Sequence, residues 1–249
     1  VPLTLLKLNP SHQIVVLEMG TNQPGDMAWM SYVAQPDVAV LTNVGESHLE
    51  KLKTPAGVYR EKIQIFKYLS KSGMAIFNND DKYWKKLKKQ RLRKLSYGLS
   101  NDSDVKASHI SGDAKQRLSF RVDRNTFQIR SPFQHNVYNA IAAIACGRLF
   151  NISANHIQEA LARFKFDGGR QDIQTIKGVL VINDTYNSNP VSFRSAVQTL
   201  DALNVKGQKI LVCADMKELG EKAERLHRQM ADVIRKTSID IVFSYGDLA

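Results

Sequence analysis

The sequence predicts an α/β fold made of two units, each built on a parallel sheet. Apolar runs of strand length, such as Ile14–Met19, Val38–Thr42 and Val179–Ile182, end in polar residues and alternate with stretches of helical periodicity. The glycine pair at positions 168–169 separates a first series of such runs from a second. The chain has 249 residues, of which 43% are hydrophobic, so it can bury a sizeable core.

The composition argues against membrane-spanning and disulfide-rich proteins. No apolar run approaches the ~20 residues that a spanning helix needs, so we expect no membrane insertion. The chain begins at Val1 without a basic segment followed by an apolar one, and we expect no secretory signal. Its two cysteines, Cys146 and Cys213, lack the spacing of a disulfide framework or a zinc site. Free thiols in a reducing compartment fit this pattern, so we expect a cytoplasmic monomer.

Most of the net charge of +11 comes from one stretch of the chain. Residues 82–94 hold eight Lys or Arg and no acidic residue, which leaves about +3 (11 − 8) for the remainder. The run predicts an exposed lysine-rich helix, and the alternatives are binding of an anionic polymer or a weak attraction for polyphosphate substrates. No aromatic platform or groove-reading motif accompanies it, so we expect no nucleic-acid partner.

The first unit opens with a strand, a helix and a second strand. The continuous apolar run Ile14–Gly20 predicts a strand buried on both faces that carries Glu18 to its carboxyl end. A helix from Pro24 to Ala34 and the strand Val38–Thr42 follow. Because open α/β sheets bind ligands at the carboxyl ends of their strands, Glu18 is a candidate ligand.

The loop Asn43–Glu50 lies at the end of the second predicted strand. It offers an amide, two carboxylates and the imidazole of His48 within a short stretch, which suits a divalent ion. The alternative is a polar loop that caps a helix.

Lys62 lies among the apolar residues of a helix predicted from Pro55 to about Ser70. It is either an ordinary lysine with a buried stem or an amine of lowered pKa that reacts with carbon dioxide. The resulting carbamate would act as a carboxylate. A strand at Gly73–Phe77 follows, and Asn78–Asp81 is predicted to cap the basic helix.

The end of the first unit changes character. The runs Arg117–Val122 and Thr126–Arg130 predict an antiparallel hairpin at the edge of the sheet. A helix from His135 to Leu149 follows, and Ser153 caps another at Asn155–Phe164. On the first of these helices, Asn136 and Asn139 are three residues apart and share a face. Their amides can bond a purine ring, although capping would explain one of them.

The second unit repeats the β/α pattern. It predicts an open parallel sheet in which Asp184 and Asp215 end the first two strands, at the edge that binds ligands. The expected strands and helices are Val179–Asp184, Pro190–Leu203, Lys209–Asp215, Glu221–Lys236 and Ile239–Ser244.

The sequence resembles the Mur ligases of peptidoglycan synthesis along essentially its whole length. Seven segments in the same order and spacing carry the resemblance. They are Leu17–Gly20, Asn43–Glu50, Glu61–Phe66, His135–Asn139, Gly169–Arg170, Asn183–Pro190 and Ala214–Gly220. The last two point to the member that adds D-alanyl-D-alanine. The alternatives are another Mur ligase, a folylpolyglutamate synthetase-like ligase, or a non-catalytic Mur-like binding module.

The resemblance implies a partial central ATPase-like domain at residues 1–166, with a small antiparallel edge, and a partial Rossmann-like C-terminal domain at 167–249. It implies ATP and Mg²⁺ as cofactors, with UDP-N-acetylmuramoyl tripeptide and D-alanyl-D-alanine as substrates. The peptide carboxylate would be phosphorylated and then attacked by the incoming amine. Glu18, His48 and carbamylated Lys62 would hold Mg²⁺, and Lys62 and His48 would serve catalysis.

The nucleotide roles are also implied by the resemblance. Asn136 and Asn139 would face the adenine. Arg170 and Asp184 would bring the second domain onto ATP, with Asp184 accepting from the ribose hydroxyls. Tyr186 and Asn187 would touch the nucleotide or order their loop.

One family motif is missing, because no Gly-Lys-Ser or Gly-Lys-Thr occurs in the sequence to form the phosphate-binding loop. We therefore expect a fragment that lacks the UDP-sugar-binding domain, the phosphate-binding loop and the C-terminal end, and that is inactive alone. A smaller departure is Phe133, which stands where the family has glycine before its His-Asn pair.

Overall fold

The first unit is organised around a mixed sheet. The structure, a computed structural model, describes residues 1–83, 86–87, 91–113, 116–166 and 169–249. In these ranges six strands lie in the order β1-β2-β3-β4-β5-β6, parallel from β1 to β4 and antiparallel from β4 to β6. This confirms a mostly parallel sheet with an antiparallel edge. The strands are β1 (Val38–Leu41), β2 (Met74–Asn78), β3 (Arg93–Gly98), β4 (Val105–Gly112), β5 (Leu118–Val122) and β6 (Asn125–Ile129).

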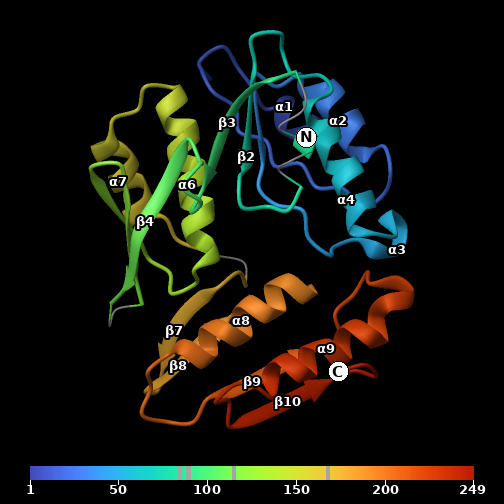
Figure 1. The fold of residues 1–249 in the computed structure, drawn as a ribbon, viewed down its shortest axis with the longest axis vertical. Helices are drawn as coiled ribbons and strands as arrows, with labels where there is room; N and C mark the ends of the chain where they lie inside the picture. Colours follow the sequence, from blue (N-terminus) through green and yellow to red (C-terminus); the bar gives the residue numbers. More distant parts are fainter. Residues whose placement is uncertain (84–85, 88–90, 114–115, 167–168) are drawn as a thin grey trace.

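Helices cover both faces of this sheet (Figure 1). Helices α2 (Asp26–Ala34) and α4 (Pro55–Lys62) lie on one face, and α6 (His135–Leu149) lies on the other. Side chains of β2 alternate between the two layers, with Phe77 in the core under α4 and Ile76 in the core under α6. The short helices α1 (Pro2–Leu5) and α3 (Leu49–Leu52) and the helix α7 (Ala154–Arg163) complete the unit.

Two predicted helices begin at a capping side chain, and one of these caps, Ser153, is the residue that the sequence predicted. The Thr54 hydroxyl accepts from Gly57 N at 3.0 Å at the start of α4, and Ser153 accepts from His156 N at 3.3 Å at the start of α7. Helix α4 ends earlier than predicted, because the chain tightens into the 3₁₀ helix η1 (Ile63–Phe66).

The strand predicted at Ile14–Gly20 is wrong, because this segment is not a strand in the structure. Ile14 and Val15 are exposed, Val16 is 89% exposed, and Leu17 and Met19 are half-buried. In the described chain β1 is hydrogen-bonded to β2, and Ile14–Gly20 does not extend that ladder. An apolar run forms a strand only beside a partner that satisfies its backbone groups.

The basic helix predicted at residues 82–94 lies partly outside the described residues, at 84–85 and 88–90. Its end is wrong, because Arg93 and Lys94 begin β3. The adjoining Asp81 accepts from Tyr83 N at 2.8 Å, as a capping residue would.

The second unit contains two small sheets. Strand β9 (Ile210–Ala214) pairs in parallel with β10 (Ile241–Tyr245), whereas β8 (Val179–Asn183) pairs antiparallel with β7 (Asp172–Ile176). The prediction of one open parallel sheet is therefore wrong. Lys177 and Gly178, which join β7 to β8, have φ angles of 49° and 83°. Two such residues form the tight turn that folds adjacent strands back on each other.

Helices of the second unit pack against the first. They are α8 (Pro190–Ala202), η2 (Gly220–Lys222) and α9 (Ala223–Ile234). Leu219 and Leu226 belong to the same buried cluster as Leu49 and Leu52 of α3. A Cβ on Gly220, where φ is 58°, would lie 3.1 Å from the Glu50 Cα, so glycine permits this close approach. Among the described residues, no helix is long and apolar enough to cross a bilayer.

Candidate active site

Lys62 lies at the carboxyl end of β1. The last residue of α4, it donates from Nζ to the Asn43 carbonyl at 3.0 Å. Burial lowers the pKa of Lys62, and the nearby Asp81 carboxylate opposes this change. A lowered pKa increases the share of neutral amine, the form that reacts with carbon dioxide. The structure therefore supplies a lysine suited to carbamylation.

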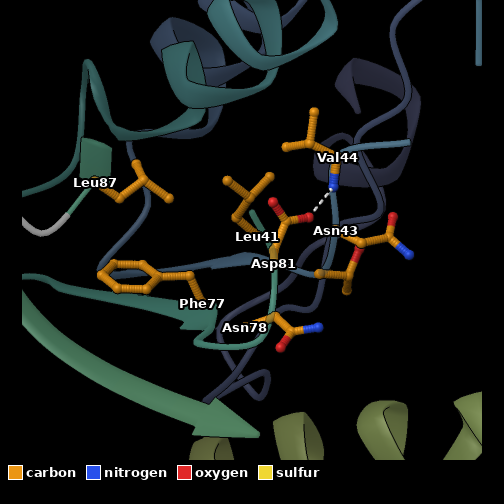
Figure 2. A pocket seen from close by; sticks show the side chains of 8 residues that line it. Leu41, Asn43, Val44, Phe77, Asn78, Asp81 and Leu87 are labelled. Carbon is orange, nitrogen blue, oxygen red and sulfur yellow. Dashed lines mark hydrogen bonds between the residues drawn. The ribbon is translucent and has the colours of Figure 1, made fainter. Parts of the chain in front are cut away.

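Asp81 fixes the loop after β1 to the end of β2. Its carboxylate accepts from Val44 N at 2.6 Å, as Figure 2 shows. The two residues line a small hollow with Asn43. The apolar side chains of Leu41, Phe77 and Leu87 and the polar residues Thr42 and Asn78 form its other walls. Asn43, which accepts the hydrogen bond from Lys62, therefore lies on a loop that Asp81 ties to the end of β2.

His48 joins the two units. Its Nδ1 lies 2.6 Å from the Glu218 carboxylate, and Glu50 N donates to the Glu218 carbonyl at 3.1 Å. His48 has a φ of 55°, so the loop turns sharply at this residue. A carboxylate on Nδ1 orients the imidazole and leaves Nε2 for another ligand.

Glu18 is exposed on the segment 14–20, which is not a strand in the structure. Across the described ranges, no group of three or more His, Cys, Asp or Glu side chains could hold a metal ion. The predicted set of Glu18, His48 and Lys62 contains only two residues of these types, so it stays a prediction. His48 and Lys62 flank the same loop of the first unit.

The predicted base-binding amides do come together. Asn139 Nδ2 donates to Asn136 Oδ1 at 2.9 Å, and Asn136 Nδ2 donates to Ser131 Oγ at 2.7 Å. Asn136 also donates to the side-chain oxygen of Gln171 at 2.5 Å. Gln171 comes from the second unit, so the amides of α6 lie at the junction between units.

Arg170, Asp184 and Tyr186 meet beside this junction. The Arg170 guanidinium lies 4.0 Å from the centre of the Tyr186 ring, and Asp184 accepts from Gln171 N at 3.2 Å. Burial raises the pKa of Asp184, while the Gln171 N–H and the charge of Arg170 oppose the change. Asn187 is exposed on the same loop.

Sequence reasoning missed three polar residues that organise these groups: Asp81, Gln171 and Glu218. Gln171 and Glu218 lie beside or inside the segments that carried the family resemblance, and Asp81 was predicted only as a cap. Each acts through a partner distant in sequence, such as His48 for Glu218. The strand and helix patterns do not reveal such pairings.

His135 is held neutral at the junction. Its Nε2 lies 2.6 Å from the Gln171 amide nitrogen, a donor, and its Nδ1 lies 2.8 Å from Ser195 Oγ. Burial lowers the pKa of His135 from its usual 6.5. The unfolded chain therefore binds a proton more readily than the folded chain as pH falls below about 6.5.

We expect the free energy of unfolding to decrease as pH falls through this range, and to decrease less steeply in His135→Gln. Urea unfolding between pH 8 and pH 5 measures both, at pH values chosen around the unperturbed His pKa of about 6.5. His156→Gln, on the exposed side of α7, is the control and should keep the wild-type slope. Equal slopes in wild type and His135→Gln would show that His135 is not held neutral.

Comparisons with known proteins agree with this geometry. The family model for the Mur ligase middle domain matches residues 1–147, and that for the Mur ligase glutamate ligase domain matches residues 169–249. The UDP-N-acetylmuramoyl-tripeptide–D-alanyl-D-alanine ligase of Bacillus subtilis is 35% identical over 249 residues, covering 99% of this chain and 54% of the relative.

Solved structures give the same result. MurF from Acinetobacter baumannii superposes with a TM-score of 0.93 at 29% identity, covering 100% of this chain and 55% of that one. MurF from Thermotoga maritima in complex with ADP gives 0.84 at 26% identity, covering 99% and 61%.

The α/β fold and the two domain matches define a protein built from a middle and a C-terminal domain of one family, and the chain belongs to the Mur ligase family. The relatives just described carry the name of its D-alanyl-D-alanine-adding member. The chain spans about half the length of the curated relatives that it matches.

Proposed function

We propose that this chain supplies the nucleotide and ligation site of an ATP-dependent ligase that joins D-alanyl-D-alanine to UDP-N-acetylmuramoyl tripeptide. The match to a ligase of that name along 99% of the chain supports the proposal. The junction between the two units, where the predicted nucleotide residues gather, is consistent with it. We further propose domain limits of 1–166 and 167–249, and a cytoplasmic monomer.

The proposed reaction has two steps. A carboxylate oxygen of the tripeptide attacks the γ-phosphorus of ATP, ADP leaves, and an acyl phosphate forms. The amine of D-alanyl-D-alanine then attacks the acyl carbon, phosphate leaves, and the amine proton passes to a base or to water. Both steps bring anionic oxygens together, so cationic and N–H donors are needed to stabilise them.

The residues of this chain have corresponding roles. Asn136 and Asn139 bind the base, and Asp184 accepts from the ribose. Arg170 places its guanidinium cation against the nucleotide. The Tyr186 ring holds this guanidinium in position, and Asn187 lies on the same loop.

Mg²⁺ neutralises phosphate charge when it is bound, and its proposed ligands are Glu18, His48 and the Lys62 carbamate. Glu18 and His48 would supply a carboxylate oxygen and an imidazole nitrogen, and the carbamate would supply the third ligand.

A ligation assay tests the proposal. The complete gene product that carries this sequence is incubated with ATP and UDP-N-acetylmuramoyl tripeptide, and with D-alanyl-D-alanine, meso-diaminopimelate, L-lysine or glutamate. ADP and a peptide product of the corresponding mass should form only with D-alanyl-D-alanine. Turnover with glutamate or with a diamino acid instead would contradict the proposal and would indicate another member of the family.

The 249-residue chain by itself is the second arm of this assay. It should not ligate, because it contains no Gly-Lys-Ser or Gly-Lys-Thr for the phosphates. Ligation by this chain at the rate of the complete gene product would contradict the need for that loop.

A further inference from the structure

Gln171 connects the two units through its side chain. It lies just before β7, and both ends of its amide reach α6. The oxygen accepts from Asn136 Nδ2 at 2.5 Å, and the nitrogen lies 2.6 Å from His135 Nε2. The backbone N–H of Gln171 donates to Asp184 at 3.2 Å, so the residue also touches the proposed ribose acceptor.

The donors of Asn136 are fully used in this arrangement. An asparagine amide carries two N–H groups. One donates to Ser131 Oγ and the other to Gln171, and Asn136 itself is only 3% exposed. No N–H of Asn136 therefore remains for a ring nitrogen of a purine while Gln171 keeps this position.

The Gln171 amide presents the same pattern as one edge of adenine. Adenine carries an acceptor, N7, beside a donor, the 6-amino group. Gln171 places its oxygen against the Asn136 donor and its amino group against the unprotonated Nε2 of His135. The pair formed by His135 and Asn136 is thus complementary to an acceptor beside a donor, whichever molecule supplies them.

We propose that the side chain of Gln171 occupies the position of the adenine edge, and that an adenine nucleotide must displace it to reach His135 and Asn136. This rests on the proposed function, because it specifies how that nucleotide site is gated. Gln171 thereby makes base binding compete with one contact between the two units. The measured dissociation constant is then the intrinsic one divided by the fraction of molecules in which Gln171 has left.

Adenosine is the probe, since it has the base and ribose but needs no phosphate-binding loop. Its Kd for this chain is measured by NMR from the side-chain signals of Asn136 and His135. In Gln171→Ala the Kd should fall roughly 5- to 100-fold, the factor for the two net hydrogen bonds that the Gln171 side chain makes. Gln171→Asn is the second variant, because asparagine tolerates the φ of 52° found here but is shorter.

Gln174→Ala is the matched control. Gln174 is exposed on β7 and donates to Asp172 at 2.5 Å, so its loss should leave the adenosine Kd unchanged. Inosine carries a carbonyl in place of the amino group. Its Kd should therefore fall less than that of adenosine in either Gln171 variant. Weaker or unchanged adenosine binding in both Gln171 variants would overturn the proposal, as would signals of Asn136 and His135 that do not respond to adenosine.

The ligation assay is independent of this titration. A chain that binds adenosine more tightly without Gln171, in a gene product that does not ligate D-alanyl-D-alanine, would refute the proposed function and keep this inference. Ligation of D-alanyl-D-alanine together with an unchanged adenosine Kd in the Gln171 variants would support the proposed function and refute this inference.

Discussion

Replacing Lys62 with alanine in the complete gene product should lower kcat for ligation by roughly a hundredfold to a thousandfold. The lysine amine is half-buried at the end of β1, and burial lowers its pKa. These conditions favour a carbamate, which would place an anionic oxygen ligand at the reacting phosphates. A short carboxylic acid such as acetate should restore part of the activity, because it replaces the missing carboxylate.

Lys67→Ala is the matched control for this experiment. Lys67 is exposed, and its Nζ lies 5.5 Å from the centre of the Tyr68 ring, so its loss should leave ligation unchanged. Rates are measured by ADP release with and without added bicarbonate. Wild-type activity in Lys62→Ala would show that Lys62 has no role in catalysis and serves only in packing.

Replacing Glu61 with alanine should destabilise the fold by about 2–4 kcal/mol. Glu61 is 6% exposed and accepts from Gly25 N at 2.9 Å and from Met27 N at 2.8 Å. Helix α2 begins here without a capping side chain of its own. Glu61 of α4 therefore satisfies the first N–H groups of α2, and its removal leaves buried donors unpaired.

Two variants refine this measurement. Glu61→Gln should lower the free energy of unfolding less than Glu61→Ala does. One oxygen remains to accept an N–H, while an amino group faces the second N–H. Glu224→Ala is the control. That carboxylate is exposed and pairs with Arg228 at 2.8 Å, so its loss should lower the free energy of unfolding by under about 1 kcal/mol. Urea unfolding reports all three. A Glu61→Ala variant within 0.5 kcal/mol of wild type, the usual range for a surface change, would contradict the capping role.

Local patterns predicted most elements but not their pairing. Helix α6 was predicted at His135–Leu149 and is found there, because its apolar spacing can be read from consecutive residues. The hairpin of β7 and β8 was missed, since Lys177–Gly178 is a less familiar turn than Asn-Gly. The run Ile14–Gly20 has the composition of a buried strand, but composition cannot supply the neighbour that a strand requires.

The candidate site was predicted in part, for a related reason. Asn136 and Asn139 share a helical turn, and their spacing predicted their contact. His48 and Glu218 are paired across the two units, and only the fold brings them together. Gln171 was overlooked because its side chain acts through α6, far from it in sequence.

We propose that this chain belongs to an enzyme that activates a carboxylate by phosphorylation before forming an amide. UDP-N-acetylmuramoyl tripeptide labelled with ¹⁸O in its reacting carboxylate tests it most directly. The released inorganic phosphate should carry one ¹⁸O atom, because a carboxylate oxygen bonds to phosphorus and leaves with it. Phosphate without the label, formed alongside the amide product, would contradict the account.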